Sequence, residues 1–223
     1  MKRVKLADRQ LPDYTRNEER ANMGTHIAGG LLGVTALVLC LVKAASDKDA
    51  CGVVAAAIYG ASLILLYTVS SVYHGLRPSM GKKVMQVIDH CTIYLLIAGS
   101  YTAVSLAAFR PMSPALGWGM FAFQWALAAL AVTLTAIDLK RYRVFSMTCY
   151  LFMGWAILPF LPHTMAALGP AGFWLLFSGG VAYTIGAVLY GIGSKKRWMH
   201  TVFHVFVVLG SLLQFLAIYL RAL

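Results

Sequence analysis

Long apolar runs, separated by short polar interruptions, recur along the chain from residue 25 to its C-terminal region. A helix needs about 20 mainly apolar residues to cross about 30 Å of hydrocarbon. Because lipid offers the backbone no hydrogen bonds, each such run must be helical. The pattern predicts an all-α, polytopic membrane protein with seven transmembrane helices, at residues 25–43, 52–74, 86–108, 116–137, 144–162, 171–192 and 199–220.

The residues before the first span are polar and basic. Residues 1–22 begin like a signal peptide, but no apolar core follows, so no cleavage is expected. We interpret them as a cytoplasmic leader, partly disordered or lying on the lipid surface, and residues 23–223 as one seven-helix domain. Turn-forming residues mark the connections, at 75–81 with Pro78, at 111–114, at Pro162 and at Gly169-Pro170. Pro159 and Pro162 interrupt the end of the fifth span.

Composition supports a membrane protein. Of the 223 residues, 60% are hydrophobic and 12% charged, and the mean hydropathy is +0.72. Soluble domains average about 45–50% apolar and about 25% charged residues, so lipid must solvate part of this chain. The net charge of +11 does not indicate a nucleic-acid partner, because the cations lie in short loops between the apolar runs.

The distribution of Lys and Arg predicts the orientation. Most of these 19 residues lie on one predicted side, namely Lys2, Arg3, Lys5, Arg9, Arg16, Arg20, Arg77, Lys82, Lys83, Lys140, Arg141, Arg143, Lys195, Lys196 and Arg197. The other side has Lys43, Lys48, Arg110 and Arg221. Cytoplasmic loops carry the excess of Lys and Arg. The N-terminus is therefore predicted to be cytoplasmic and the C-terminus outside.

Asp89 is the only acidic residue that lies within a predicted span rather than in the leader, in a loop or at a span's end. An ionisable group in the membrane costs roughly 2.5–3.5 kcal/mol at the centre of a helix and less near an end. Such a group faces the bundle and has a partner, and a functional role is the default reading. The alternative is a simple ion pair with Lys82 or Lys83.

Five of the six histidines lie toward the predicted cytoplasmic ends of the spans, and His163 lies at the other side. His200 and His204 are four residues apart, so both rings emerge from one helix face and can bind one Zn²⁺. His74 adds a third imidazole, with Ser70 one turn away. Three protein ligands leave a fourth position for water, the pattern of a catalytic zinc site, and Asp89 could act on that water.

Each of these features also has a structural interpretation. A lone HxxxH pair is weak evidence for metal, and His74 or Ser70 could serve interfacial hydrogen bonding or helix packing. His90 is predicted to face away from Asp89, and His26 is a weaker candidate than the HxxxH pair. The glycine-rich stretches at residues 29–33 and 179–191 favour close helix packing over phosphate binding. Cys40 and Cys51 flank one short loop, which leaves a disulfide between them open.

Four blocks of residues carry a resemblance to a known family. They are Glu19-x-x-Asn22-x-x-Thr25-His26, Ser70-x-x-x-His74, Asp89-His90-x-x-x-Tyr94 with residues 97–102, and His200-x-x-x-His204. With these blocks in order over residues 19–220, the chain resembles the hemolysin III proteins, the bacterial branch of the progestin and adipoQ receptor family of seven-helix membrane proteins. Ala103 stands where that family usually has Pro, so no kink is expected there.

The resemblance implies a multi-pass protein of the bacterial inner (plasma) membrane, with a zinc ion held by His74, His200 and His204. Asp89 and Ser70 would lie beside the metal-bound water, and Glu19, Asn22 and Thr25 would form a cytoplasmic block of unsettled role. Membrane lipid is the expected environment and the candidate substrate.

Two functions from different classes remain open. The first is a zinc-dependent hydrolase of lipid amides or esters, ceramidase-like by analogy, with Asp89 as general base and Ser70 assisting at the oxyanion. The second is a non-enzymatic, zinc-stabilised regulator of membrane homeostasis. Pore formation is disfavoured because tightly packed hydrophobic helices suit secretion and reinsertion poorly. The sequence leaves the substrate and the oligomeric state open.

Overall fold

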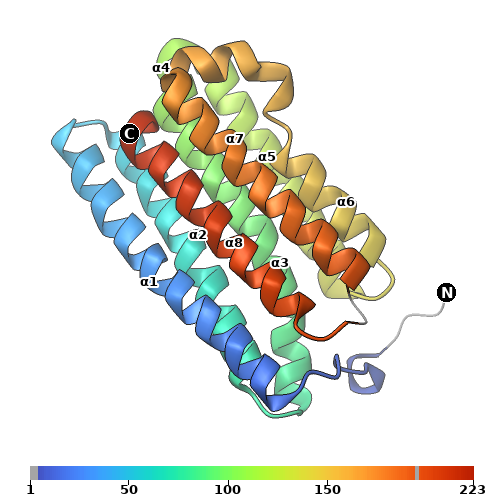
Figure 1. Ribbon diagram of the computed structural model, residues 1–223. Coiled ribbons are helices and arrows are strands. Elements are labelled where there is room, and N and C mark those ends of the chain that lie inside the picture. Colours follow the sequence, from blue (N-terminus) through green and yellow to red (C-terminus); the bar gives the residue numbers. More distant parts are fainter. Residues whose placement is uncertain (1–4, 194–195) are drawn as a thin grey trace.

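The computed structural model describes residues 5–193 and 196–223, and within these ranges all regular structure is helical. Figure 1 shows the helices packed side by side as one bundle. In chain order the elements are η1 (Leu6–Asp8), α1 (Arg16–Ser46), α2 (Ala50–Gly75), α3 (Met80–Ala103), η2 (Val104–Phe109), α4 (Arg110–Met112), α5 (Pro114–Ile137), α6 (Arg143–Gly154), η3 (Leu158–Phe160), α7 (Leu161–Gly193), α8 (Met199–Ala217) and η4 (Ile218–Ala222).

Among the described residues, six helical segments are long and apolar enough to cross a membrane. They are Arg16–Ser46, Ala50–Gly75, Met80–Met112, Pro114–Ile137, Arg143–Gly193 and Met199–Ala222. The all-helical, membrane-spanning architecture is therefore confirmed. Lys2, Arg3 and Lys195, which contribute to the predicted orientation, lie outside the described residues.

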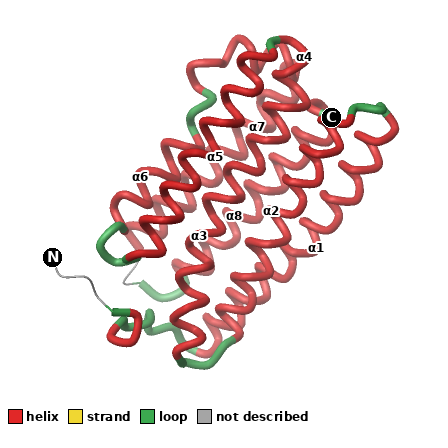
Figure 2. The backbone as a smooth tube through the Cα atoms, turned by 180° about the vertical axis from the view of Figure 1, so that it is seen from behind, coloured by secondary structure: helices red, strands yellow, loops and turns green. Residues whose placement is uncertain are grey.

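Sequential helices pack as antiparallel neighbours, and the bundle is closed by contacts between α1 and α8 (Figures 1 and 2). Among the spanning segments, the one that contains α3 is the most enclosed. Apolar side chains on the outer helices stay exposed, including Leu31 and Val42 on α1 and Val188 and Ile192 on α7. A bundle with a filled centre and an apolar exterior suits a lipid environment.

Glycines allow the helices to approach closely. Gly29 of α1 lies against the ring of Tyr67 on α2, which a Cβ at this position would overlap. At Gly60 an added Cβ would lie 2.6 Å from the Cα of Leu37. The interpretation of residues 29–33 and 179–191 as packing residues holds at Gly29 and Gly179, but Gly191 has no neighbour within 4 Å of such a Cβ.

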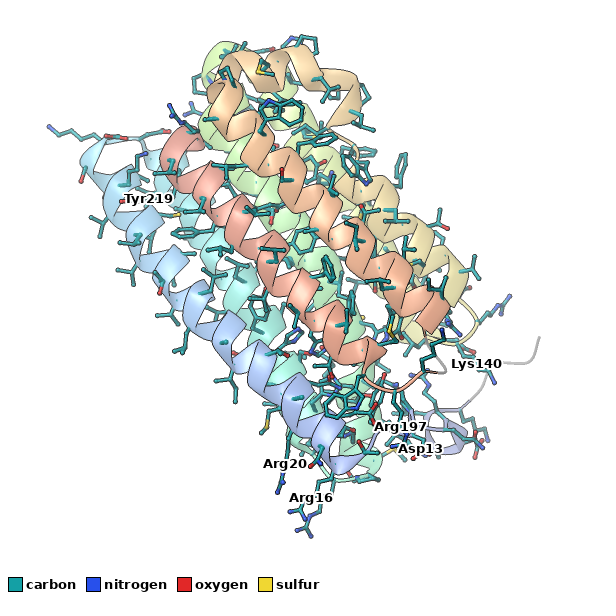
Figure 3. All side chains as sticks on the ribbon, viewed as in Figure 1. Asp13, Arg16, Arg20, Lys140, Arg197 and Tyr219 are labelled. Atoms are coloured by element: carbon teal, nitrogen blue, oxygen red, sulfur yellow. The ribbon has the colours of Figure 1, made fainter. Side chains whose placement is uncertain are left out.

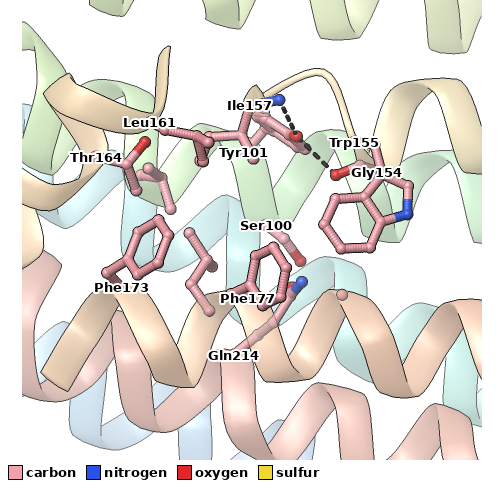
Figure 4. Close-up of a pocket in the computed structure, with 13 residues that line it drawn as sticks. Ser100, Tyr101, Gly154, Trp155, Ile157, Leu161, Thr164, Phe173, Phe177 and Gln214 are labelled. Atoms are coloured by element: carbon pink, nitrogen blue, oxygen red, sulfur yellow. Dashed lines mark hydrogen bonds between the residues drawn. The ribbon is translucent and has the colours of Figure 1, made fainter. Parts of the chain in front are cut away.

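The fifth predicted span ends earlier than expected. A helix over 144–162 was predicted, but α6 ends at Gly154, and the chain turns before η3. The hydroxyl of Tyr101 on α3 donates to the Gly154 carbonyl at 2.8 Å and accepts from the Ile157 amide at 3.0 Å, which holds the turn (Figure 4). Further along, Gly169 takes a positive φ of 65° before Pro170, and α7 is kinked there.

The leader and the first span also differ from expectation. The helix α1 begins at Arg16, so the last residues of the predicted leader are helical and continue the span. Thr15 and Glu18 form a capping box that starts the helix at this point. The division into a leader and a transmembrane domain stays a prediction.

Two smaller expectations concern the third span and the cysteines. After Ala103 the third span continues as the π-helical segment η2. All four cysteines are free, so Cys40 and Cys51 are not paired.

Candidate metal centre

Three histidines from two helices meet at one end of the bundle. His74 lies in the last turn of α2, and His200 and His204 lie in the first turns of α8. The Nε2 atom of His200 is 3.2 Å from that of His74 and 3.0 Å from that of His204. One ligand atom from each ring lies within 4.8 Å of the others, so the three rings can hold one metal ion.

The outward-facing ring nitrogens of two of these histidines contact residues of α1. His74 Nδ1 lies 2.6 Å from a carboxylate oxygen of Glu19, and His204 Nδ1 lies 3.2 Å from the backbone carbonyl of Asn22. Both partners accept hydrogen bonds, so each Nδ1 carries the proton and each Nε2 presents a lone pair to the centre. An oriented ring of this kind is the usual arrangement of a metal-binding histidine.

Hydrogen bonds among the three histidines cannot satisfy all three Nε2 atoms. If His74 and His204 keep their protons on Nδ1, then His200 Nε2 can donate one proton to only one of the two neighbouring nitrogens. The Nε2 lone pair of the other neighbouring histidine then has no proton to accept, although it is buried in the protein. A cation would satisfy all three nitrogens, and imidazole is a common ligand of Zn²⁺. The donor set therefore fits a zinc ion.

The first turns of α1 connect all the helices that supply this site. Glu19 also accepts from Nζ of the buried Lys82 on α3 at 2.6 Å. Asn22 accepts from the Thr201 hydroxyl through its side chain at 2.6 Å. These contacts join α1 to α2, α3 and α8, and they assign structural positions to the Glu19 block, whose role the sequence left open.

Glu18 fixes the start of α8. Its carboxylate accepts from the Trp198 amide at 2.7 Å, and Trp198 has a φ of 66° in the left-handed region. A residue other than glycine rarely adopts this conformation unless its surroundings hold it there. His200 therefore occupies its place partly because Glu18 secures the residue that precedes α8.

Tyr14, just before α1, covers the centre from the leader side. Its ring stacks on that of His200, with centroids 5.0 Å apart and an interplanar angle of 17°. Burial raises the pKa of the Tyr14 phenol above its usual value, so this residue stays neutral at physiological pH. Tyr14 thus shields the histidine cluster without adding a charge.

Asp89 and Ser70 lie beside the cluster. The Asp89 carboxylate interacts electrostatically with His74, and Ser70 lies one helical turn before His74 on α2. Its only ion-pair contact among the described residues is to His90 at 3.9 Å. The alternative pairing with Lys82 or Lys83 is wrong, because Lys82 binds Glu19 and Lys83 donates to the Ala7 carbonyl. The Ser70 hydroxyl is buried and has no well-formed hydrogen bond to any residue that the structure describes.

The remaining histidines differ from one another. His26 stacks on His204 at a centroid distance of 3.6 Å, and neither of its buried ring nitrogens has a hydrogen-bond partner in the described part of the chain. His26 therefore lies closer to the cluster than its sequence position suggested. His90 directs Nδ1 to the Gln86 carbonyl at 2.8 Å, and His163 is exposed near the start of α7, away from the cluster.

Sequence reasoning missed Tyr14 and Glu18, and it considered Lys82 only as an ion-pair partner of Asp89, not of Glu19. A signal for Glu18 was present, because Thr15-x-x-Glu18 is a capping-box pattern and predicts a helix start at Arg16. Nothing local indicates that Lys82 and Tyr14 face the cluster. Both come from segments far from α8 in the sequence.

The bundle and the buried histidine cluster define the class: a polytopic helical membrane protein with a candidate metal centre near one end. Residues 14–215 match the family described as "Haemolysin-III related", and the chain belongs to this family. It is 36% identical over 205 residues to the hemolysin-3 homolog of Bacillus subtilis (strain 168), which covers 92% of this chain and 94% of that one.

Other relatives extend the comparison. The chain is 35% identical over 201 residues to hemolysin-3 of Bacillus cereus, with 90% of each chain covered. It is 28% identical over 210 residues to the monocyte to macrophage differentiation factor of Homo sapiens, covering 91% of this chain and 83% of that one. No solved structure matches the chain.

Proposed function

We propose that the chain crosses a bacterial inner membrane seven times, with its N-terminus cytoplasmic and its C-terminus outside. The segment Arg143–Gly193 has 51 residues, whereas about 20 suffice for one crossing. It turns back between α6 and α7, which supports two crossings (Figure 1). Arg16, Arg20, Lys140 and Arg197 lie toward one end of the bundle, as a positive cytoplasmic side requires (Figure 3).

We further propose that His74, His200 and His204 hold a zinc ion and that the protein hydrolyses a lipid amide or ester. The observation that carries this proposal is the convergence of three Nε2 atoms, with Glu19 and Asn22 orienting two of the rings. Zinc bound there would polarise a carbonyl and lower the pKa of water. The site lies in an apolar bundle, so the substrate class is a membrane lipid.

The chain's own residues would perform the remaining chemistry. Asp89 accepts a proton from the water molecule whose oxygen adds to the carbonyl carbon. As the C–N or C–O bond breaks, Asp89 returns that proton to the leaving nitrogen or oxygen, which yields a carboxylic acid and an amine or alcohol. The Ser70 hydroxyl, which has no well-formed hydrogen bond within the described part of the chain, donates to the carbonyl oxygen as negative charge develops there.

Metal analysis of purified protein tests the zinc site. We expect about one zinc per chain, by the three-imidazole arrangement. His200→Ala and His204→Ala should lose most of it, whereas His163→Ala, whose ring lies away from the cluster, should keep it. Equal zinc content in all three variants would contradict the proposal that the histidine cluster binds zinc.

The substitution Asp89→Asn separates an enzyme from a regulator. The regulator remains a candidate because a cation at the cluster would also tie α2 to α8. Asp89→Asn keeps the shape of the side chain and removes its basicity, so zinc should stay bound. A hydrolase should lose activity by about 10²–10⁴-fold. Full complementation of a deletion strain by Asp89→Asn, with full zinc content, would contradict the hydrolase and support the regulator.

A further inference from the structure

A second polar site lies outside the histidine cluster, where the leader packs against the start of α3. The element η1 contacts α3, and an open pocket lies between the residues that follow η1 and the start of α3. Its lining comes from the leader, from the loop before α3 and from the first turn of α3: Arg9, Gln10, Leu11, Pro78, Ser79, Met80 and Lys83. Two of these residues are cationic, and none is acidic.

The guanidinium group of Arg9 is buried, and two of its nitrogens lack a hydrogen-bond acceptor among the described residues. The residue is only 8% exposed, yet its Nε and Nη1 atoms are buried without a hydrogen-bond partner from residues 5–193 or 196–223. No carboxylate among the described residues pairs with it. A buried guanidinium without acceptors is costly, and a bound anion would offset that cost.

The start of α3 adds a second attraction for an anion. Ser79 caps the helix by accepting from the Lys82 amide at 3.2 Å, and its carbonyl accepts from the Lys83 amide. Met80 and Gly81 come before these residues, and their amides have no partner in the part of the chain that the structure describes. The N-terminus of a 24-residue helix carries partial positive charge and favours anions.

From these two independent features we infer that Arg9, Lys83 and the first turn of α3 form a binding site for a phosphate group. The guanidinium fork matches phosphate oxygens. Ser79 and Met80, at the N-terminus of α3, line the same pocket as Arg9. The site lies at the same end of the bundle as the histidine cluster, because His74 is in the last turn of α2 and the site is at the start of α3. A phospholipid headgroup and free phosphate share this chemistry.

Calorimetric titration of the full chain in neutral detergent at low salt tests the inference and separates the two sources. The probes are dihexanoyl phosphatidylglycerol, inorganic phosphate and dihexanoyl glycerol, which lacks phosphate. Binding of the phospholipid alone assigns a lipid headgroup, and binding of inorganic phosphate assigns free phosphate. Both results support the site, whereas equal binding of dihexanoyl glycerol, or no binding of any probe, overturns it.

Variants locate the binding. Arg9→Gln should weaken it about tenfold or more, because a hydrogen-bonded charge is lost. Arg9→Lys should give an intermediate effect, and the exposed Arg20→Gln should change it by less than about twofold. Equal affinities of Arg9→Gln and wild type, or an equal loss in Arg20→Gln, would contradict the site.

A thermal unfolding measurement on each variant separates binding from folding. If Arg9→Gln does not fold, Lys83→Gln and the salt dependence of the wild-type protein decide the question. The affinity of the wild-type protein should fall as ionic strength rises, because the attraction is electrostatic. Affinity independent of salt, together with unchanged binding in Lys83→Gln, would overturn the proposal.

Discussion

At the residue scale, the side chain of Glu19 connects the histidine cluster to α3. One carboxylate oxygen lies 2.6 Å from His74 Nδ1, and the other accepts from Lys82 Nζ at 2.6 Å. Lys82 also donates to the Leu76 carbonyl at 2.9 Å, just after α2 ends. Glu19 therefore controls both the orientation of His74 and the junction between α2 and α3.

This position gives a test at the residue scale. Glu19→Gln keeps the size of the side chain but loses the charge that stabilises His74 and Lys82. We expect zinc affinity to fall by about 10–100-fold, the usual effect of losing an outer partner of a metal-binding histidine. Competition with a fluorescent chelator measures the change.

Asp13→Asn is the matched control for Glu19→Gln. Asp13 is exposed, so its substitution should leave zinc affinity unchanged. If Glu19→Gln bound zinc as tightly as the wild-type protein, Glu19 would have no part in orienting His74. A purely structural role would lower thermal stability without changing the zinc affinity of the folded protein.

At the scale of elements, the break between α6 and α7 depends on a contact from another helix. Gly154 and Pro159 weaken the helix locally, but the Tyr101 hydroxyl of α3 holds the turn by two hydrogen bonds. Figure 4 shows this turn above an apolar cavity lined by Phe173 and Phe177. The position of the break therefore depends both on the residues between α6 and α7 and on the contact from α3.

The two hydrogen bonds of Tyr101 predict how its substitution changes the free energy of unfolding. Tyr101→Phe removes the hydroxyl and leaves the Gly154 carbonyl and the Ile157 amide without their partner. We expect the free energy of unfolding to fall by about 1–3 kcal/mol. Chemical unfolding in micelles measures this, with Tyr142→Phe as a control because its hydroxyl forms no hydrogen bond with any described residue. Equal stability of Tyr101→Phe and the wild-type protein would mean that the turn does not depend on this contact.

At the scale of the whole molecule, the proposed topology places the histidine cluster and the phosphate site on the cytoplasmic side. A reporter fused after Leu223 should therefore be external, and one inserted at Arg77, in the loop between α2 and α3, should be cytoplasmic. The physical reason is the excess of Lys and Arg at the end of the bundle that carries that loop. Reporters on the same side in both fusions would mean that the number of spans is wrong.

The sequence alone determined the features that depend on neighbouring residues. Apolar runs of sufficient length specify membrane-spanning helices, because lipid leaves the backbone no other way to form its hydrogen bonds. The four-residue spacing of His200 and His204 places both rings on one face of α8. The resemblance in four blocks identified the family, which the comparisons confirmed.

Only the tertiary structure decided which distant residues meet. His74 reaches His200 because α2 ends where α8 begins, and no local pattern sets that register. Glu19 reaches His74 because α1 begins at Arg16, before the predicted start of the first span at residue 25. The break after Gly154 needed Tyr101 from α3, 53 residues away in the chain. Each of these contacts depends on how whole helices pack, and packing is a property of the assembled bundle rather than of any one segment.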